Sequence, residues 1–542
     1  MHGMVCLERV IDRLMTYHKN NQNRNVQKNS LVLKVNHISI RHQNNIIFPA
    51  TSWQVKKGEN WAMIGENGSG KSNLIRAICG KLPLTTGKIE YHFFRNKTFQ
   101  TQPYNWIETV SFHSVGRMLK KQGVVYQSRW NSFMNDEAQK VSEFLSYENI
   151  HKINPYEITR NLPDKPGFLQ LEKEVIDLLD IRALYKKKII QLSNGELRII
   201  LIAKSLLKNP EIIIFDNPFT GLDQSNRKKL GDILENLMEK KIQVILLLND
   251  AKSIPGWVTH LLWIKDNTIV VKGRARDVLS DRFVQKALAK KEIKPIAAYI
   301  GLPVAPESEE NNGPEILLKL CKAKVIHGEH QILDSIDWEI KKGQHWVLMG
   351  PNGSGKSTLL SLILGDNPQA YANEIYLFGK KRGTGESIWD IKKKMGFVAP
   401  ELQAYYPIQF TAFDVVCSGF FDTIGVFKKC TSVQLKTALK WMNILNVAQD
   451  KEKRFGALSN GGQRIILLAR ALVKKPKLLI LDEPCQDLDA ANRSKVLTIV
   501  EQVVQHSGTT LIFVTHIPDE IPEVITHRLV LEQGKVLENN RI

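Results

Sequence analysis

The stretch Trp61-Ala-Met-Ile-Gly65-Glu-Asn67-Gly68-Ser69-Gly70-Lys71-Ser72 decides the fold, and it recurs as Trp346-Val-Leu-Met-Gly350-Pro-Asn352-Gly353-Ser354-Gly355-Lys356-Ser357. Each copy places Gly-x-x-x-x-Gly-Lys-Ser after four apolar residues and before an apolar pattern that is typical of a helix. A strand, a glycine-rich loop and a helix in this order form a phosphate-binding loop, because the backbone N–H groups face a polyphosphate at the helix N-terminus. The sequence therefore predicts two phosphate-binding loops.

Other segments show that most of the chain is a duplication. The run Leu192-Ser-Asn-Gly195 recurs as Leu458-Ser-Asn-Gly461, and an apolar run that ends in Asp216 recurs as one that ends in Asp482, both at an offset of 266 residues. The lysines of the two loops differ by 285 positions, so the first copy carries an insertion, which we place on the surface between Phe93 and Leu169. We predict domains at 31–280 and 315–542, a proline-rich linker at 281–314 and a disordered extension at 1–30.

Composition is that of a globular protein. The 542 residues are 43% hydrophobic and 24% charged, with a formal net charge of +20. No apolar run approaches the ~18 residues that span a bilayer. The first residues lack a signal-peptide core, and the six cysteines form no CxxC pair, so a disulfide framework or zinc cluster is not expected. We expect a cytoplasmic protein, with peripheral association at the inner membrane as an option, and interpret the scattered basic clusters as solvated surface.

With Leu-Ser-x-Gly between each loop and each aspartate-ended strand, the chain resembles the ATP-binding-cassette (ABC) ATPases over nearly all of its length past residue 31. The resemblance implies an α/β fold: two P-loop NTPase domains of ABC type in tandem, each with a small antiparallel β lobe and a helical lobe that carries the signature Leu-Ser-Asn-Gly. Within the family, Gly379-Lys-Lys-Arg-Gly-Thr-Gly and Ser418-Gly-Phe-Phe-Asp422 resemble the ModF-type tandem ATPases, a group also labelled photorepair proteins. That label implies molybdate transport only by association.

The resemblance also implies that the two domains close head to tail, so that each ATP lies between the loop of one copy and the signature of the other. The chain would then be a monomer with an internal domain dimer. Ser72 and Asp216 in the first copy, and Ser357 and Asp482 in the second, would ligate Mg²⁺. The other residues expected to contact nucleotide are Gly65, Asn67, Gly68, Ser69, Gly70, Lys71, Asn73, Gly350, Asn352, Gly353, Ser354, Gly355, Lys356, Thr358, the signature residues Ser193, Gly195, Ser459 and Gly461, the D-loop residues Asp223 and Asp489, and His42 and His327 beside adenine.

The copies differ at the residues that would break the terminal phosphate bond. In the second copy, Glu483 follows Asp482 and is placed to deprotonate the attacking water, and His516 fits the switch residue that senses the γ phosphate. The first copy has Asn217 and Asn249 at these positions, and an amide cannot act as a base. We therefore expect ATP to be retained at the first site and hydrolysed at the second, with Glu483 and His516 as the catalytic residues.

Three roles remain open from the sequence: the ATP-binding component of a transporter with a membrane permease, a ribosome-associated translation factor, and a regulatory ATPase without a transporter. The linker is short and rich in proline, which disfavours the translation-factor branch, and nucleic acid is a weaker alternative partner. The glutamine that normally contacts Mg²⁺ and the coupled partner has no counterpart at the expected spacing near Pro400 or near His113, and Gln127 is a fallback in the first copy. The usual mode of coupling to a transporter is therefore in doubt.

Overall fold

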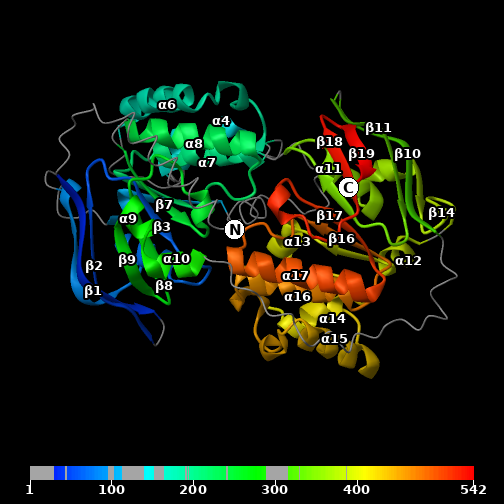
Figure 1. Cartoon of the computed structure of the whole chain (residues 1–542). Coiled ribbons are helices and arrows are strands. Elements are labelled where there is room, and N and C mark those ends of the chain that lie inside the picture. The colour runs from blue at the N-terminus through cyan, green and yellow to red at the C-terminus, as the bar shows by residue number, and fades with distance from the viewer. Residues whose placement is uncertain are drawn as a thin grey trace. The chain divides into compact units, whose positions relative to one another are not determined.

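The computed structural model describes residues 30–42, 45–94, 103–112, 139–151, 164–189, 192, 194–239, 242–288, 315–328, 330–385 and 387–542. Among these residues, those up to 288 belong to one compact unit and those from 315 onward to a second (Figure 1). Nearly all of the predicted N-terminal extension, and most of the predicted linker, lie outside the described residues. The first unit continues through helix α10 (Arg282–Leu288), within the segment assigned to the linker, and Val284 of that helix is buried.

Each unit is built on a six-stranded sheet that is parallel except at one edge. The order in the first unit is β5-β6-β7-β3-β8-β9, and the equivalent order in the second is β15-β16-β17-β12-β18-β19. The last strand of each sheet pairs antiparallel. The strands are β3 (Trp61–Ile64), β5 (Ile107–Ser111), β6 (Ile212–Asp216), β7 (Gln243–Leu248), β8 (His260–Lys265), β9 (Thr268–Arg274), β12 (Trp346–Met349), β15 (Met395–Val398), β16 (Leu478–Asp482), β17 (Thr510–Val514), β18 (His527–Glu532) and β19 (Lys535–Arg541).

The central strands explain why these sheets are buried. β7, β16 and β17 are runs of mostly Val, Ile, Leu and Phe, and every residue in them is buried. Continuous apolar runs of this kind are expected where helices cover both faces of a parallel sheet. Both phosphate-binding loops begin at the carboxyl edge of these sheets, and both aspartate-ended strands end there. Open α/β sheets bind their ligands at this edge.

A smaller antiparallel sheet forms the β lobe of each unit, with order β2-β1-β4 in the first and β11-β10-β13-β14 in the second. Its strands are β1 (Leu31–His42), β2 (Asn45–Lys56), β4 (Leu84–Tyr91), β10 (Ile316–His327), β11 (His330–Lys341), β13 (Glu374–Leu377) and β14 (Lys380–Lys381). The lobes, the parallel sheets and the helices confirm the predicted fold class.

Helices complete both units. The first contains α2 (Lys71–Ile78), α4 (Val141–Phe144), α5 (Tyr147–His151), α6 (Lys165–Leu179), α7 (Asn194–Leu206), α8 (Gln224–Glu239), α9 (Ala275–Leu279) and α10. The second contains α11 (Lys356–Leu364), α12 (Ile388–Lys393), α13 (Pro400–Tyr405), α14 (Ala412–Ser418), α15 (Ser432–Ile444), α16 (Asn460–Leu472) and α17 (Ala490–Ser507). Helices α7 and α16 begin within the two signature motifs. None of the helices in the described part of the chain is long and apolar enough to cross a bilayer.

Matching aromatic stacks support the amino ends of the two loop-bearing strands. Trp61 at the start of β3 stacks on His260 with ring centroids 4.9 Å apart, and Trp346 at the start of β12 stacks on His527 at 4.8 Å. Each of these tryptophans also meets a second tryptophan edge-on, Trp53 or Trp338. The duplication therefore extends to core packing far from the motifs.

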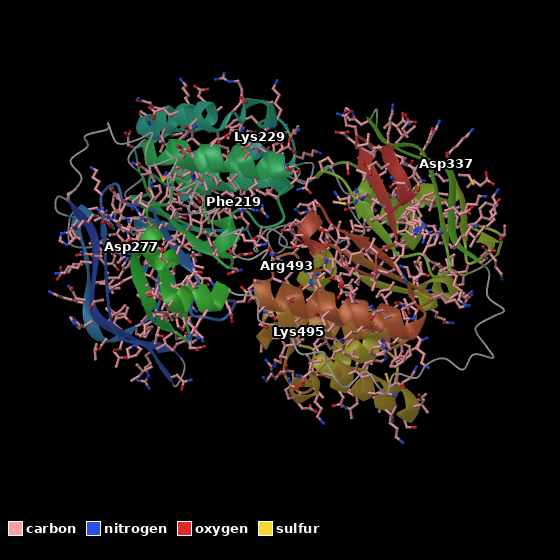
Figure 2. The ribbon with its side chains drawn as sticks, viewed as in Figure 1. Phe219, Lys229, Asp277, Asp337, Arg493 and Lys495 are labelled. Atoms are coloured by element: carbon pink, nitrogen blue, oxygen red, sulfur yellow. The ribbon has the colours of Figure 1, made fainter. Side chains whose placement is uncertain are left out.

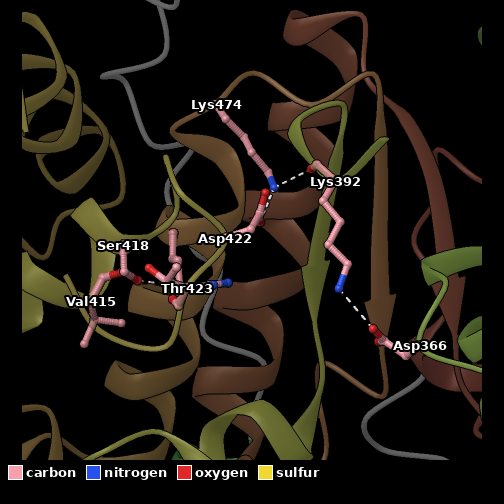
Figure 3. A network of polar contacts seen from close by, with 8 residues as sticks. Asp366, Lys392, Val415, Ser418, Asp422, Thr423 and Lys474 are labelled. Carbon is pink, nitrogen blue, oxygen red and sulfur yellow. Dashed lines mark hydrogen bonds and ion pairs between the residues drawn. The ribbon is translucent and has the colours of Figure 1, made fainter. Parts of the chain in front are cut away.

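A polar network ties the helical lobe of the second unit to its ATPase core (Figure 3). The buried Lys474 side chain, which follows α16, forms an ion pair with Asp422 and donates to the Lys392 carbonyl oxygen at 2.7 Å. The Lys392 ammonium in turn pairs with Asp366 at 3.0 Å. Burial lowers the pKa of Lys474 to about 8, against the opposing effect of the Asp422 charge. The loop that follows α14 is therefore held in place from two elements of the core.

Candidate nucleotide sites

The two phosphate-binding loops share the hydrogen bonds that their lysines donate to backbone carbonyl oxygens. Lys71 Nζ donates to the carbonyl oxygens of Gly65 and Glu66 at 2.5 and 3.0 Å, and Lys356 Nζ donates to those of Gly350 and Pro351 at 2.8 and 2.9 Å. Each ammonium group is thereby held within its loop. The prediction that both copies form a strand, a loop and a helix around this lysine agrees with the geometry.

Glycine is required where each loop begins. A Cβ at Gly65 would collide with the Ile264 carbonyl oxygen, and a Cβ at Gly350 would collide with that of Leu531. The N-caps of α2 and α11 are Gly70 and Gly355, with φ of 103° and 101°, a left-handed conformation that favours glycine. Ser72 and Ser357 are exposed in the first turn of these helices. Glycine thus allows each loop to turn directly into a helix N-terminus, which favours an anion.

The second loop faces a buried carboxylate. Asp482 ends β16, is 9% exposed, and lies close enough to Glu401, Glu483 and Lys356 to interact electrostatically with all three. Burial, helped by the charges of Glu401 and Glu483, raises the pKa of Asp482 well above its usual range, while Lys356 acts in the opposite direction. Carboxylate and hydroxyl oxygens are ligands that Mg²⁺ prefers. The residues present therefore fit a Mg-nucleotide, as does the buried Ser354 hydroxyl of the loop, which has no partner among the described residues.

The predicted catalytic pair is assembled in the second unit. His516 Nδ1 lies 3.1 Å from Glu483 Oε1. Burial alone would lower the pKa of His516, but the hydrogen bond and charge of Glu483 outweigh that effect and raise the pKa. Glu483 itself has φ of 42°, in the left-handed region, and its N–H donates to the Val514 carbonyl oxygen at 3.0 Å. Strand pairing thus fixes the direction of the Glu483 side chain.

A second set of contacts, which sequence reasoning missed, holds the histidine segment. Thr515 Oγ1 donates to Glu520 Oε2 at 3.2 Å, and Glu520 Oε1 pairs with Arg493 Nε at 3.1 Å. Arg493 lies on α17, as Figure 2 shows. The backbone next to His516 is therefore tied to the helix that follows the D-loop. Sequence spacing alone gives no sign of this contact.

The first unit has Arg227 where the second has Arg493, but it lacks the glutamate, the histidine and the residues that support the histidine. Strand register aligns Leu247 with Val514, so Asn249 takes the place of His516, and Leu248 and Ser253 take those of Thr515 and Glu520. Asn217, with φ of 49°, donates from Nδ2 to Asp216 Oδ1 at 3.1 Å. The Asn249 side-chain oxygen is buried and has no hydrogen-bond partner among the described residues. The first site therefore keeps the phosphate loop but has no base and no histidine support.

The signature motifs stand at helix N-termini. Ser459 is exposed, caps α16 and accepts from the Gly462 N–H at 3.2 Å. Gly461 packs closely against Asn492. A Cβ added at Gly461 would lie 2.5 Å from the amide carbon of that side chain. In the first unit, a Cβ added at Gly195 would lie 3.3 Å from Asn226 Oδ1, so there is more space. Ser193 lies outside the described residues.

The D-loop aspartates have a role within their own units. Asp489 is 2% exposed, caps α17, and accepts from the Asn492 backbone N–H at 2.8 Å and from its side-chain Nδ2 at 2.9 and 3.1 Å. Asp223 holds Asn226 in the same way. Each aspartate thus fixes the asparagine that packs against the signature glycine. Asn226 and Asn492 repeat at the offset of 266 residues, so the sequence already indicated that the two asparagines are equivalent.

Residues after Pro400 occupy the place of the missing glutamine. Pro400 begins α13 directly after β15, so Glu401 lies beside Asp482, and Gln403 Nε2 donates to Gln463 Oε1 of the signature helix at 2.9 Å. Gln463 donates in turn to the carbonyl oxygens of Phe455 and Leu458 at 3.0 and 3.2 Å. Gln403, three residues after Pro400, therefore connects α13 to the signature helix α16 of the same unit. His113 and Gln127 lie outside the described residues.

The remaining residues predicted to contact nucleotide lie at equivalent positions in the two units, and their contacts stay predictions. His42 and His327 end β1 and β10 at the turns of the two β lobes, so they remain predicted neighbours of adenine. Asn73 follows Ser72 in α2, and Thr358 follows Ser357 in α11. Asn67 and Asn352 lie in the loops themselves.

Comparisons with known proteins agree with this geometry. The family model described as "ABC transporter" matches residues 48–220 and 333–486. The chain is 34% identical over 479 residues to the ABC transporter ATP-binding protein ModF of Escherichia coli, covering 87% of this chain and 91% of ModF. It is 27% identical over 502 residues to an uncharacterized ABC transporter ATP-binding protein of Schizosaccharomyces pombe, covering 91% and 96%. A solved structure of an RNase-L inhibitor shares the tandem fold, with a TM-score of 0.53 and 19% identity over 93% of this chain and 90% of that one.

The chain belongs to the ABC transporter family, with two ATP-binding cassettes in tandem, and it is an ATPase. Its tandem arrangement is of the ModF type, because the similarity to ModF runs through both cassettes.

Proposed function

We propose that the chain binds two Mg-ATP at a head-to-tail interface between its units. Lys71, Ser72 and Asp216 would face Ser459 and Gly461 at the first site. Lys356, Ser357 and Asp482 would face Ser193 and Gly195 at the second. The proposal is supported by the exposure of Ser459 at the N-terminus of α16, where backbone N–H groups and the helix dipole favour an anion.

Hydrolysis is proposed at the second site alone, and one observation carries this: the Glu483–His516 contact at 3.1 Å, where the first unit has Asn217 and Asn249. Glu483 would take a proton from the attacking water, the terminal P–O bond would break, and His516, held by Glu483, would face the γ phosphate. Lys356 would neutralise charge on the phosphates. Mg²⁺, when bound at Ser357 and Asp482, would supply further charge neutralisation.

We further propose a role as the ATP-binding component of a transport system of the molybdate type, with a membrane permease as partner. The similarity to ModF supports this role, and the ribosome-associated and regulatory alternatives lack a comparable observation. The protein would then be a cytoplasmic monomer that docks peripherally at the inner membrane.

Steady-state phosphate release from two variants tests the asymmetry. Glu483→Gln keeps the size and polarity of the side chain but removes the base, so turnover should fall ~10²–10⁴-fold. Asn217→Ala removes only an amide at a site without a base, so turnover should stay within about twofold. Equal losses in the two variants would exclude the asymmetric assignment. The same Glu483→Gln chain, held with ATP, can be used for affinity capture: recovery of a permease supports the transport role, and recovery of ribosomes contradicts it.

A further inference from the structure

Helix α15 and the loop before it expose an unusual concentration of apolar side chains. Phe427 is 77% exposed and Val433 is 70% exposed, and Leu435 and Leu439 also face outward. The opposite side of α15 is fully used, because Ala438, Trp441 and Met442 are buried in the core of the helical lobe. Single exposed apolar residues are ordinary, but a group of this size on a short segment is a feature of interaction surfaces. The outer residues are therefore not required by the packing of the lobe.

Lysines alternate with these apolar residues. We define the α15 face as Phe427, Lys428, Lys429, Val433, Leu435, Lys436, Leu439 and Lys440, all of them exposed. The sequence contains no acidic residue between Asp422 and Asp450. The two flanking acids are already paired, Asp422 with Lys474 and Asp450 with Lys453. Within the part of the chain that the structure describes, the four lysines of the face make no ion pair, so no salt bridge neutralises their combined charge of +4.

The equivalent helix of the first unit shows that the fold does not impose this composition. Helix α6 precedes the first signature as α15 precedes the second, yet it carries Glu172, Glu174 and Asp177, and Leu169 is its only strongly exposed large apolar residue within the described part of the chain. The two helices share a position in the cassette and differ in surface chemistry. The α15 face is therefore a property of the second unit.

We propose that the α15 face binds the surface of an anionic lipid bilayer, with α15 lying in the plane of the interface. Val433 on one edge of the exposed side of α15, Leu435 and Leu439 on the other edge, and Phe427 from the preceding loop would enter the boundary between headgroups and acyl chains. Lys436 and Lys440 lie between these edges on the helix and would contact lipid phosphates. A helix face of apolar and lysine side chains suits this interface. Lysine is depleted at protein interfaces, where arginine, methionine and aromatic residues are enriched, and the face has no arginine for reading nucleic acid bases.

Sedimentation of the purified full chain with vesicles tests the proposal. We expect binding to phosphatidylcholine vesicles that contain 30% phosphatidylglycerol, little binding to phosphatidylcholine alone, and weaker binding as salt rises. Lys436→Gln with Lys440→Gln should lower the partition coefficient about 25-fold, from about fivefold for each lysine near a charged membrane. Phe427→Ser with Val433→Ser should also lower it at least tenfold, because apolar area is no longer buried.

The matched control is Lys165→Gln with Lys173→Gln on α6, which removes the same charge from the equivalent helix and should leave binding within about twofold. Circular dichroism and phosphate release establish that each variant is folded, since none of these residues belongs to the nucleotide sites. The proposal is overturned if the control loses as much binding as the α15 lysine variant, since the net charge of +20 would then explain it. Absent binding to anionic vesicles, or full binding by the Phe427 and Val433 variant, overturns it equally.

Discussion

Gly461→Ala should destabilise the second unit, and the contacts give the magnitude. The new Cβ would lie 2.5 Å from Asn492, so the asparagine has to move. Its side chain makes two hydrogen bonds to the buried Asp489, and a hydrogen bond to a charged group contributes ~1.5–3 kcal/mol. Breaking about one such bond, less up to ~1 kcal/mol gained because alanine favours a helix over glycine, gives a net loss of ~0.5–3 kcal/mol.

Gly195→Ala is the matched variant in the first unit. Its nearest neighbour, Asn226, lies 3.3 Å from the new Cβ and has to shift by only a few tenths of an ångström. The gain in helix propensity then predicts a change within about 0.5 kcal/mol of zero. Comparing the two glycines separates packing against the asparagine from any general effect of alanine in a signature motif.

Urea denaturation, followed by hydrogen exchange in peptides from α16 and α17, measures the loss and assigns it to the second unit. In an Asn492→Ala background the amide group is absent and only the Cβ of residue 492 remains, 3.1 Å from the new Cβ, so adding Gly461→Ala should cost clearly less than in the natural chain. An equal loss for Gly461→Ala with and without Asn492 would refute this account, and so would an equal loss for Gly195→Ala.

Two further predictions concern the second unit. Lys474→Met should make the difference in unfolding free energy from the natural chain depend on pH. The pKa of Lys474 is lowered to about 8 in the folded protein from ~10.4 in the unfolded chain, so the unfolded chain binds more protons between these values. The stability of the natural chain should therefore rise by ~2 kcal/mol relative to the variant from about pH 7.5 to about pH 9.5. Paired thermal melts check this, and a constant difference would contradict it. Glu520→Gln should weaken the contacts to Arg493 and Thr515 and thereby loosen the His516 segment. The kcat should fall ~3–30-fold while KM for ATP stays within twofold, because only that segment changes. A rise in KM without a fall in kcat would contradict this reasoning.

Sequence patterns were sufficient for the parts of the molecule that are local in the chain. The loops around Lys71 and Lys356, and the strands that end in Asp216 and Asp482, depend on neighbouring residues and on the alternation of strand and helix. The same patterns repeated twice made the tandem fold predictable. Glu483 was assigned a role because it follows Asp482 directly.

Contacts between distant segments could not be predicted in this way. The support of His516 depends on Glu520 and on Arg493 from α17, and the fixing of Gly461 depends on Asn492. These pairings follow from sheet register and helix packing, which single positions do not encode. The burial of Asp489 was missed for the same reason, since a D-loop motif gives no sign of which way its carboxylate turns.

The left-handed backbone at Glu483 and Asn217 has a consequence for the conformational strain in the two units. A long acidic side chain in that conformation costs of order 1–3 kcal/mol, whereas asparagine tolerates it with little penalty. At this position the first unit therefore avoids a backbone strain that the second unit retains. The second unit retains the strain at the residue whose carboxylate contacts His516.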